Sequence, residues 1–247
     1  MKALFKVDSE GIPYNVDTFS AYQGFKELGF ECLFFNKYED LIDVDHKQEE
    51  PIVGDFEILK QRLHEFNIEY KRIDFPAEIG EFIGRLMFST NIQTVKKNPK
   101  FLPLFIKSLG DKRLPGKVFL NSNDVDSHIN DSDNFEVLCS YPVNFTSEWR
   151  VFIRHGEVLD VRPYKGDWKV HCNHQIIKDA VQTYTSAPSA YSLDFGVTDE
   201  NETLLININE GCTSECYGLN PEVYARFLLT RWEELSKTSH FSISQNI

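Results

Sequence analysis

The sequence has little positive charge and few cysteines, and each shortage narrows the class of protein. Its 26 lysine and arginine residues face 38 aspartate and glutamate residues, which gives a formal net charge of −12. Nucleic-acid binding needs clustered Lys and Arg for phosphate contacts, so we do not expect a nucleic-acid partner. The 5 cysteines are an odd number in a chain of 247 residues. That count favours reduced thiols in a cytoplasmic protein over a disulfide framework.

Long apolar runs are missing as well. No stretch approaches the ~20 residues that a helix needs to cross a bilayer, and the segment 1–7 is too short and too polar for a signal peptide. We therefore expect no membrane partner. Neither a P-loop, nor a G-x-G-x-x-G motif, nor a Ser-His-Asp arrangement is present. Hydrophobic residues make up 41% and aromatic residues 13% of the chain, which is enough to fill a sizeable core.

The first part of the chain alternates predicted strands and helices. Residues 2–7 and 31–36 are typical of short strands, and apolar residues at every third position predict a helix from 17 to 28. After the apolar run 51–54, Asp55 is placed to cap a helix that extends to about residue 67. This order indicates a small α/β lobe with a partly parallel sheet.

The remainder is richer in strands. A helix is expected over residues 85–100, another over 176–184, and a terminal helix over 221–235, where Pro221 suits the first helical position. Residues 121–134 are compatible with an exposed turn or a short helix. The predicted strands cover residues 104–108, 118–120, 136–140, 148–154, 157–162, 192–197 and 203–209.

Three of these elements, in this order, resemble the ATP-grasp superfamily, most closely its R2K clade. The first is the strand 104–107 with the Gly-containing basic loop 110–116 after it. The second is the strand 137–140, which leads into Glu148-Trp149-Arg150. The third is the paired-strand segment that carries Asp194 and Asn207-Ile208-Asn209. The resemblance covers residues 85–235.

The resemblance implies an α+β ATP-grasp fold, in which two α+β lobes surround an ATP cleft. A small α/β pre-ATP-grasp-like lobe would precede it. The implied domains are a leading lobe over residues 1–95, a nucleotide-loop lobe over 96–145, and a metal and catalytic lobe over 146–247.

The resemblance also implies a nucleotide site. Lys107 would meet phosphate oxygens as a compact charge, and the loop with Lys112 and Arg113 would close over the phosphates. The strand 136–140 would bind adenine through its main chain. Each of these predictions has a simpler alternative. Lys107 could be an edge lysine in solvent, the loop a basic turn without a ligand, and the strand 136–140 an ordinary buried strand. The implied cofactor-binding residues are Lys107, Lys117, Glu136, Cys139, Ser140, Glu148 and Lys165.

Arg150 is the strongest candidate for catalysis. Glu148 and Arg150 are two positions apart on a strand, so their side chains share one face. The planar, permanently charged guanidinium of Arg150 suits a transferring phosphate or an acyl phosphate. A cross-strand ion pair is the alternative. Lys107 and Arg162 complete the implied catalytic set.

Asp194, Asn207 and Asn209 are the implied metal ligands. Mg²⁺ prefers hard oxygen ligands, and these three residues supply them from two adjacent strands. The chain departs from the family here, because the family pattern is Glu-x-Asn and this chain has Asn207-Ile208-Asn209. Glu210 or Asp194 could compensate for the lost carboxylate. Strand asparagines that cap neighbouring loops are the alternative.

Together these features predict an ATP-dependent carboxylate–amine ligase that uses ATP and Mg²⁺ and produces ADP through an acyl phosphate. Its partners would be small-molecule or peptide carboxylate and amine substrates. The alternative is an ATP-grasp-fold nucleotide-binding or interaction protein without ligase turnover, and an α+β protein without any nucleotide site is a third option. The spacing within 171–174 and 212–216 is not that of a structural zinc site. The sequence does not indicate the oligomeric state.

Overall fold

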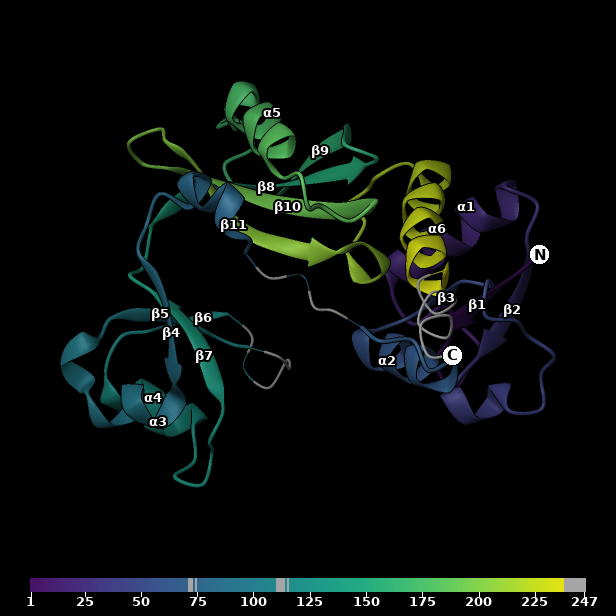
Figure 1. Cartoon of the computed structure of the whole chain (residues 1–247), viewed down its shortest axis with the longest axis horizontal. Helices are drawn as coiled ribbons and strands as arrows, with labels where there is room; N and C mark the ends of the chain where they lie inside the picture. The colour runs from purple at the N-terminus through teal and green to yellow at the C-terminus, as the bar shows by residue number, and fades with distance from the viewer. Residues whose placement is uncertain (71–72, 74, 110–113, 115, 238–247) are drawn as a thin grey trace, which may run out of the picture. The chain divides into compact units, whose positions relative to one another are not determined.

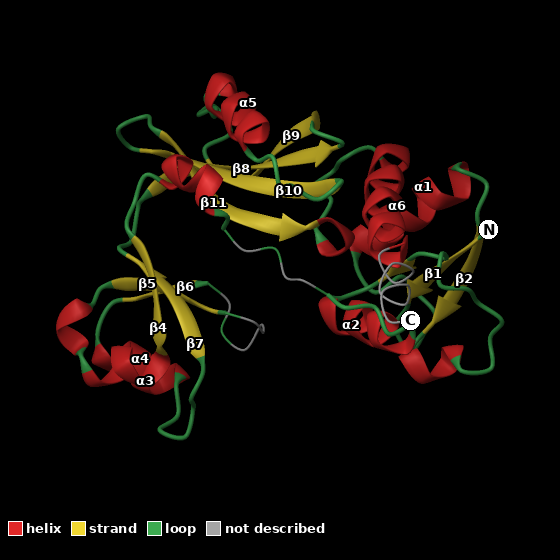
Figure 2. Cartoon of the chain, in the orientation of Figure 1, coloured by secondary structure: helices red, strands yellow, loops and turns green. Residues whose placement is uncertain are grey.

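The computed structural model describes residues 1–70, 73, 75–109, 114 and 116–237, and they belong to two compact units (Figure 1). The large unit combines Met1–Phe82 with the chain from Thr146 onward, and the small unit is Ile83–Phe145. Both units contain helices and strands (Figure 2), so the predicted α+β class is confirmed. Among the described residues, no helix has the length and apolarity that a membrane span requires.

The leading part of the large unit contains a parallel three-stranded sheet in the order β2-β1-β3. Helix α1 begins after Asn15, and α2 begins after Asp55, whose side chain accepts a hydrogen bond from the Ile58 main chain as an N-cap should. The predicted alternation of strands and helices is confirmed. The elements are β1 (Lys2–Lys6), α1 (Val16–Glu27), β2 (Glu31–Phe35), η1 (Tyr38–Leu41), β3 (Ile52–Val53), α2 (Phe56–Glu65) and η2 (Ala77–Ile83).

The second sheet of the large unit has the order β11-β10-β8-β9. It is built from two antiparallel hairpins, β8–β9 and β10–β11, as the sequence predicts. Strand β10 is buried along its whole length. The elements are β8 (Phe145–Arg154), β9 (Glu157–Gly166), α5 (His174–Thr183), β10 (Ala190–Thr198), β11 (Thr203–Glu210), η4 (Gly211–Thr213) and α6 (Pro221–Lys237).

Helix α6 joins these two parts into one core. Phe5 and Phe25 from the leading part pack in the same cluster as Phe152 from β8 and Phe227 from α6. Helices α1 and α6 approach so closely that a Cβ atom at Gly24 would lie 1.9 Å from the main-chain oxygen of α6's first residue. Residues 1–82 therefore pack with the C-terminal sheet, and the predicted three-part domain division stays a prediction.

The small unit is an antiparallel sheet in the order β4-β7-β5-β6, with α3 and α4 contributing to its core. The predicted helix over 85–100 is wrong in its first half. Residues 87–91 pair with β7 along their whole length, and the Asn91 side chain caps the helix that follows. The elements are β4 (Met87–Asn91), α3 (Ile92–Lys97), η3 (Pro99–Phe101), β5 (Leu104–Ser108), β6 (Lys117–Phe119), α4 (Ser122–His128) and β7 (Glu136–Ser140).

Candidate functional site

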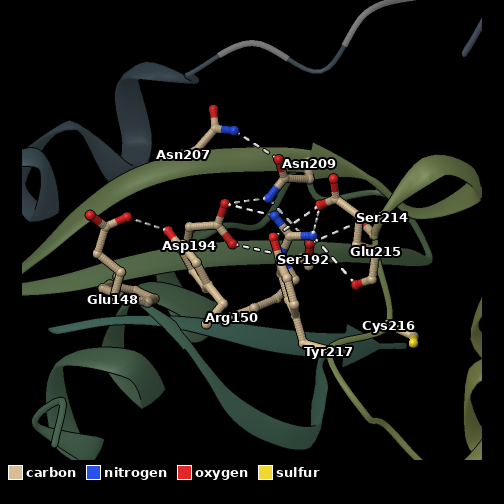
Figure 3. A network of polar contacts seen from close by, with 12 residues as sticks. Glu148, Arg150, Ser192, Asp194, Asn207, Asn209, Ser214, Glu215, Cys216 and Tyr217 are labelled. Carbon is tan, nitrogen blue, oxygen red and sulfur yellow. Dashed lines mark hydrogen bonds and ion pairs between the residues drawn. The ribbon is translucent and has the colours of Figure 1, made fainter. Parts of the chain in front are cut away.

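Polar side chains gather on one face of the C-terminal sheet (Figure 3). Alternate positions of three neighbouring strands supply them, because residues two apart on a strand share a face. Arg150 and Asp194 are each only 4% exposed, so both charges are buried. Buried charges are tolerated only when they are paired and hydrogen-bonded. We call this set the polar face; it consists of Glu148, Arg150, Ser192, Asp194, Asn207 and Asn209.

Arg150 is held by two carboxylates. Its Nε and Nη2 donate to Oδ1 and Oδ2 of Asp194 at 2.7 and 2.9 Å, and its Nη1 lies 2.8 Å from Oε2 of Glu215. Burial works against the charged guanidinium, but the hydrogen bonds and the charge of Asp194 raise the pKa of Arg150 above its ordinary value. Arg150 therefore stays charged. The cross-strand ion pair, which was the alternative interpretation of this residue, is also present.

The three predicted metal ligands lie side by side. Asn209 Nδ2 donates to Asp194 Oδ2 at 2.9 Å, and Asn207 Nδ2 donates to Asn209 Oδ1 at 2.7 Å. Their oxygen atoms suit Mg²⁺, but the set falls short in charge, because its one carboxylate already faces Arg150 with both oxygens. Among the described residues no group of three His, Cys, Asp or Glu side chains is placed to hold a metal. The magnesium site stays a prediction.

Glu210 does not supply the lost carboxylate. It follows Asn209 by one residue, so its side chain lies on the opposite face of the strand. There it pairs with Arg231 at 2.6 and 2.9 Å and accepts a hydrogen bond from the Tyr70 hydroxyl at 3.0 Å. Of the two residues that could compensate for Asn207, Glu210 is therefore ruled out by its position.

Further cations lie on strand β9. Arg162 is the direct partner of Arg150 in the β8–β9 register. Its Nη2 lies 2.6 Å from Asp160 Oδ2, but its Nε is buried and has no hydrogen-bond partner in the part of the chain that the structure describes. A buried N–H without an acceptor fits an anionic oxygen such as that of a phosphate.

Glu148 connects to the same strand. Its Oε1 lies 2.5 Å from Nζ of Lys165, and its Oε2 accepts from the Tyr164 hydroxyl at 2.8 Å. Both of its oxygens are therefore in use. Burial, with the charges of Asp194 and Glu148, raises the pKa of Tyr164, so its hydroxyl stays a donor at neutral pH.

The loop after β11 brings two residues that the sequence analysis missed. The Tyr217 ring stacks on Tyr164 with centroids 5.0 Å apart and an interplanar angle of 15°. The guanidinium carbon of Arg150 lies 4.7 Å from the Tyr217 centroid. Glu215 and Tyr217 reach the polar face, whereas Cys212 and Cys216 of the same loop are buried. The sequence analysis considered the segment 212–216 only for the spacing of its cysteines.

The predicted nucleotide residues of the small unit occupy β5, β6 and β7. Cys139 faces the core, and burial raises its pKa to about 11, whereas Lys107 and its register partner Leu138 share the opposite face of the sheet. Lys117 lies 2.7 Å from His128 Nε2. Lys112 and Arg113 fall outside the described residues.

The adenine prediction for residues 136–140 meets a constraint. Strand β7 has a neighbour on each edge, β4 and β5, so its main-chain groups are committed to the sheet. Glu136 lies at the exposed start of the strand and Ser140 at its buried end. Main-chain groups outside the ladder begin after Ser140, at residues 141–144, which the sequence analysis did not select. The roles of Glu136, Cys139 and Ser140 stay predictions.

Comparison with protein families matches residues 82–227, more than half of the chain, to the ATP-grasp domain of R2K clade family 2. The chain belongs to the ATP-grasp superfamily, in its R2K clade. The predicted ATP-grasp fold is thereby confirmed. Comparison with curated proteins gives no significant sequence match.

Solved ATP-grasp structures share this fold. D-cycloserine synthetase DcsG is similar with a TM-score of 0.52 and 11% identity, over 93% of this chain and 99% of that chain. N5-carboxyaminoimidazole synthetase from Staphylococcus aureus, complexed with ADP, has a TM-score of 0.52 and 10% identity, over 95% and 78%. D-alanine–D-alanine ligase from Bacillus anthracis has a TM-score of 0.50 and 14% identity, over 96% and 97%. At these identities the likeness shows the fold.

Proposed function

We propose that this ATP-grasp chain is an ATP-dependent carboxylate–amine ligase, which forms an amide or peptide bond through an acyl phosphate and releases ADP. The observation that carries the proposal is Arg150, a buried and charged guanidinium held by Asp194 on the polar face. An ATP-grasp family member has a use for such a group, because fixed cations stabilise the charge of a transferring phosphoryl group. ATP would supply that phosphoryl group and activate a carboxylate.

The chain's own residues would mainly position and neutralise charge. Asp194 holds the guanidinium plane of Arg150, so that Nη1, which now contacts the exposed carboxylate of Glu215, is the group able to turn to a phosphate oxygen. The buried Nε of Arg162 would donate to the same anion from the neighbouring strand. In the small unit, Lys107 and Lys117 are proposed to bind the nucleotide phosphates as point charges.

The substrate class rests on the family and its neighbours. A D-alanine–D-alanine ligase and a D-cycloserine synthetase share the fold, and both names denote enzymes that join or build small molecules. We propose a small-molecule or peptide carboxylate and an amine as the substrates of this chain.

One observation favours a second function. The polar face carries Asn207 where the family has Glu. Asp194, the carboxylate among the three predicted metal ligands, is already paired with Arg150. A nucleotide-binding ATP-grasp protein without turnover would have these properties. Calorimetry with ATP, with and without Mg²⁺, separates the two functions, because metal-independent binding without hydrolysis belongs to the second.

The test of the ligase is release of ADP and phosphate when ATP is supplied with a panel of amino acids and peptides. We expect at least one carboxylate and amine pair to stimulate release, and Arg150→Ala to abolish the stimulation. If no pair stimulates release and Arg150→Ala behaves as the unmodified protein does, the ligase proposal fails.

A further inference from the structure

Glu215 is a carboxylate in excess on the polar face. Its Oε2 lies 2.8 Å from Arg150 Nη1, but Asp194 already neutralises Arg150. The side chain is 56% exposed, and Oε1 accepts no hydrogen bond from the residues that the structure describes. The other cations around the face have carboxylates of their own, so Glu215 is not needed by them. Those pairs are Arg162–Asp160 and Lys165–Glu148.

An aromatic surface lies beside this carboxylate. The Tyr217 hydroxyl donates to Glu215 Oε2 at 3.2 Å, and its ring stacks on that of Tyr164. Tyr217 remains 37% exposed, and burial raises its pKa to about 12, so the ring is a neutral phenol at physiological pH. The Arg150 guanidinium carbon already lies 4.7 Å from the ring centroid, so the ring accepts a cation, and with the exposed carboxylate beside it the arrangement suits an organic cation.

The loop holds these groups in a fixed position. The Cys216 N–H donates to Asp17 Oδ1 at 2.7 Å, and the Tyr224 hydroxyl donates to the Ser214 carbonyl at 2.7 Å. Tyr217 has a φ of 42°, in the left-handed region that an aromatic residue rarely adopts. An unfavourable backbone conformation maintained by its surroundings points to a role for the side chain it positions.

We propose that Glu215, Tyr217 and Tyr164 form a subsite for a primary ammonium group, namely that of the amine co-substrate. Oε1 of Glu215 accepts a hydrogen bond from the ammonium, and the Tyr217 ring contacts the adjoining carbon atoms. The subsite adjoins Arg150, so an amine held there lies next to the group proposed to bind the acyl phosphate. Only the identification of the ligand as a co-substrate rests on the proposed function.

The test compares butylammonium with butanol, its neutral analogue of equal chain length, by saturation-transfer NMR on the full-length protein at neutral pH. We expect butylammonium to bind and butanol to give no saturable signal. Glu215→Gln should weaken butylammonium binding about tenfold. A loss of this size is expected when one exposed charge-assisted hydrogen bond, next to an aromatic ring, becomes a neutral one. Equal binding of butylammonium and butanol, or unchanged binding by Glu215→Gln, would overturn the proposal.

Matched variants separate binding from folding. Glu157→Gln removes an exposed carboxylate at the start of β9, away from this loop in sequence, and should leave binding unchanged. Tyr217→Gly relieves the positive φ, which offsets part of the stability lost with the stacked ring, so we expect a small change in melting temperature together with weaker binding. A lower melting temperature with unchanged binding would assign Tyr217 to structure alone and contradict the proposal.

The ligase and the subsite can fail separately. Charge-selective binding that depends on Glu215 supports the subsite even when no ADP is released. Normal ADP release, with its dependence on amine concentration unchanged by Glu215→Gln, overturns the subsite and leaves the ligase standing.

Discussion

Two buried arginine–carboxylate pairs of nearly the same geometry involve strands of the C-terminal sheet. Arg150 contacts Asp194 at 2.7 and 2.9 Å, and Arg231 contacts Glu210 at 2.6 and 2.9 Å. Each arginine uses its remaining Nη1 for a second, more exposed carboxylate, Glu215 in one case and Glu234 in the other. The pairing alone therefore does not distinguish a functional arginine from a structural one.

The surroundings do distinguish them. Arg231 lies on α6, and its partner Glu210 accepts a hydrogen bond from the Tyr70 hydroxyl. Glu234, the second partner, accepts hydrogen bonds from the main chain and the hydroxyl of Ser189. These contacts connect α6 to β11 and to the residue before β10, which is a structural role. Arg150 instead shares the polar face with Asn207 and Asn209. Beside it lie a stacked tyrosine pair and Arg162, whose buried Nε has no hydrogen-bond partner among the described residues. Arg150 is therefore accompanied by polar and aromatic groups that the fold does not need. These additional groups indicate a ligand site.

The largest expected effect concerns the structural pair. Glu210→Ala leaves Arg231 buried with only Glu234, so we expect the free energy of unfolding to fall by about 3 kcal/mol, measured by urea denaturation. Adding Arg231→Met should recover part of the loss, since an apolar side chain carries no desolvation cost. A loss below about 1 kcal/mol would place this pair among ordinary surface ion pairs.

The second effect concerns turnover. Arg150→Lys keeps a charge beside Asp194 but loses the planar fork, so we expect the rate of ADP release to fall on the order of 10²-fold. The matched change, Arg231→Lys, should leave the rate per folded molecule unchanged. Equal rate losses in the two variants would remove the distinction between the arginines.

A third change adds the carboxylate that the family has. Asn207→Glu places a second negative charge next to Asp194 and Asn209, so we expect Mn²⁺ affinity to rise about tenfold, followed by electron paramagnetic resonance. Asn207→Gln, which adds length without charge, is the control. Similar Mn²⁺ affinities in the two variants would show that the polar face is not a metal site.

The smallest expected effect is a pH dependence of stability that comes from Glu234, the second partner of Arg231. Burial opposes ionisation of Glu234, but hydrogen bonds from Ser189 outweigh it and lower its pKa below the ordinary 4.5. A lowered folded-state pKa stabilises the fold above the unfolded value, and that stabilisation is lost as pH falls through the folded value. The stability difference between the unmodified protein and Glu234→Gln should therefore shrink on acidification below 4.5, as followed by thermal unfolding. A stability difference that stays constant as the pH falls would contradict this prediction.

Much of the fold could be predicted from local patterns. The two hairpins follow from alternating polarity, and both leading helices follow from apolar spacing, with Asp55 predicted as the cap of the second. The error at residues 87–91 arose because β4 is a strand only through its pairing with β7, about fifty residues later. Local propensity carries no information about such a distant partner.

The residues of the site likewise divide into those that the sequence predicts and those that depend on tertiary contacts. Strand periodicity predicts that Asn207 and Asn209 share a face, and the family resemblance implies that Arg150 and Asp194 lie at the same site; the structure brings these side chains together. The partner of Arg231 could not be predicted, since in the sequence that residue only continues the apolar spacing of the terminal helix. Glu215 and Tyr217 were missed because a loop reaches the polar face through tertiary contacts that have no sequence period.

The most direct test of the ligase account is hydroxylamine trapping of the acyl phosphate. The protein would be incubated with ATP, a carboxylate from the panel and hydroxylamine in place of the amine, and the hydroxamate would be measured together with ADP. The account predicts hydroxamate and ADP in equal amounts with at least one carboxylate, and their loss in Arg150→Lys but not in Arg231→Lys. ADP release without hydroxamate, or equal trapping by both variants, would contradict it.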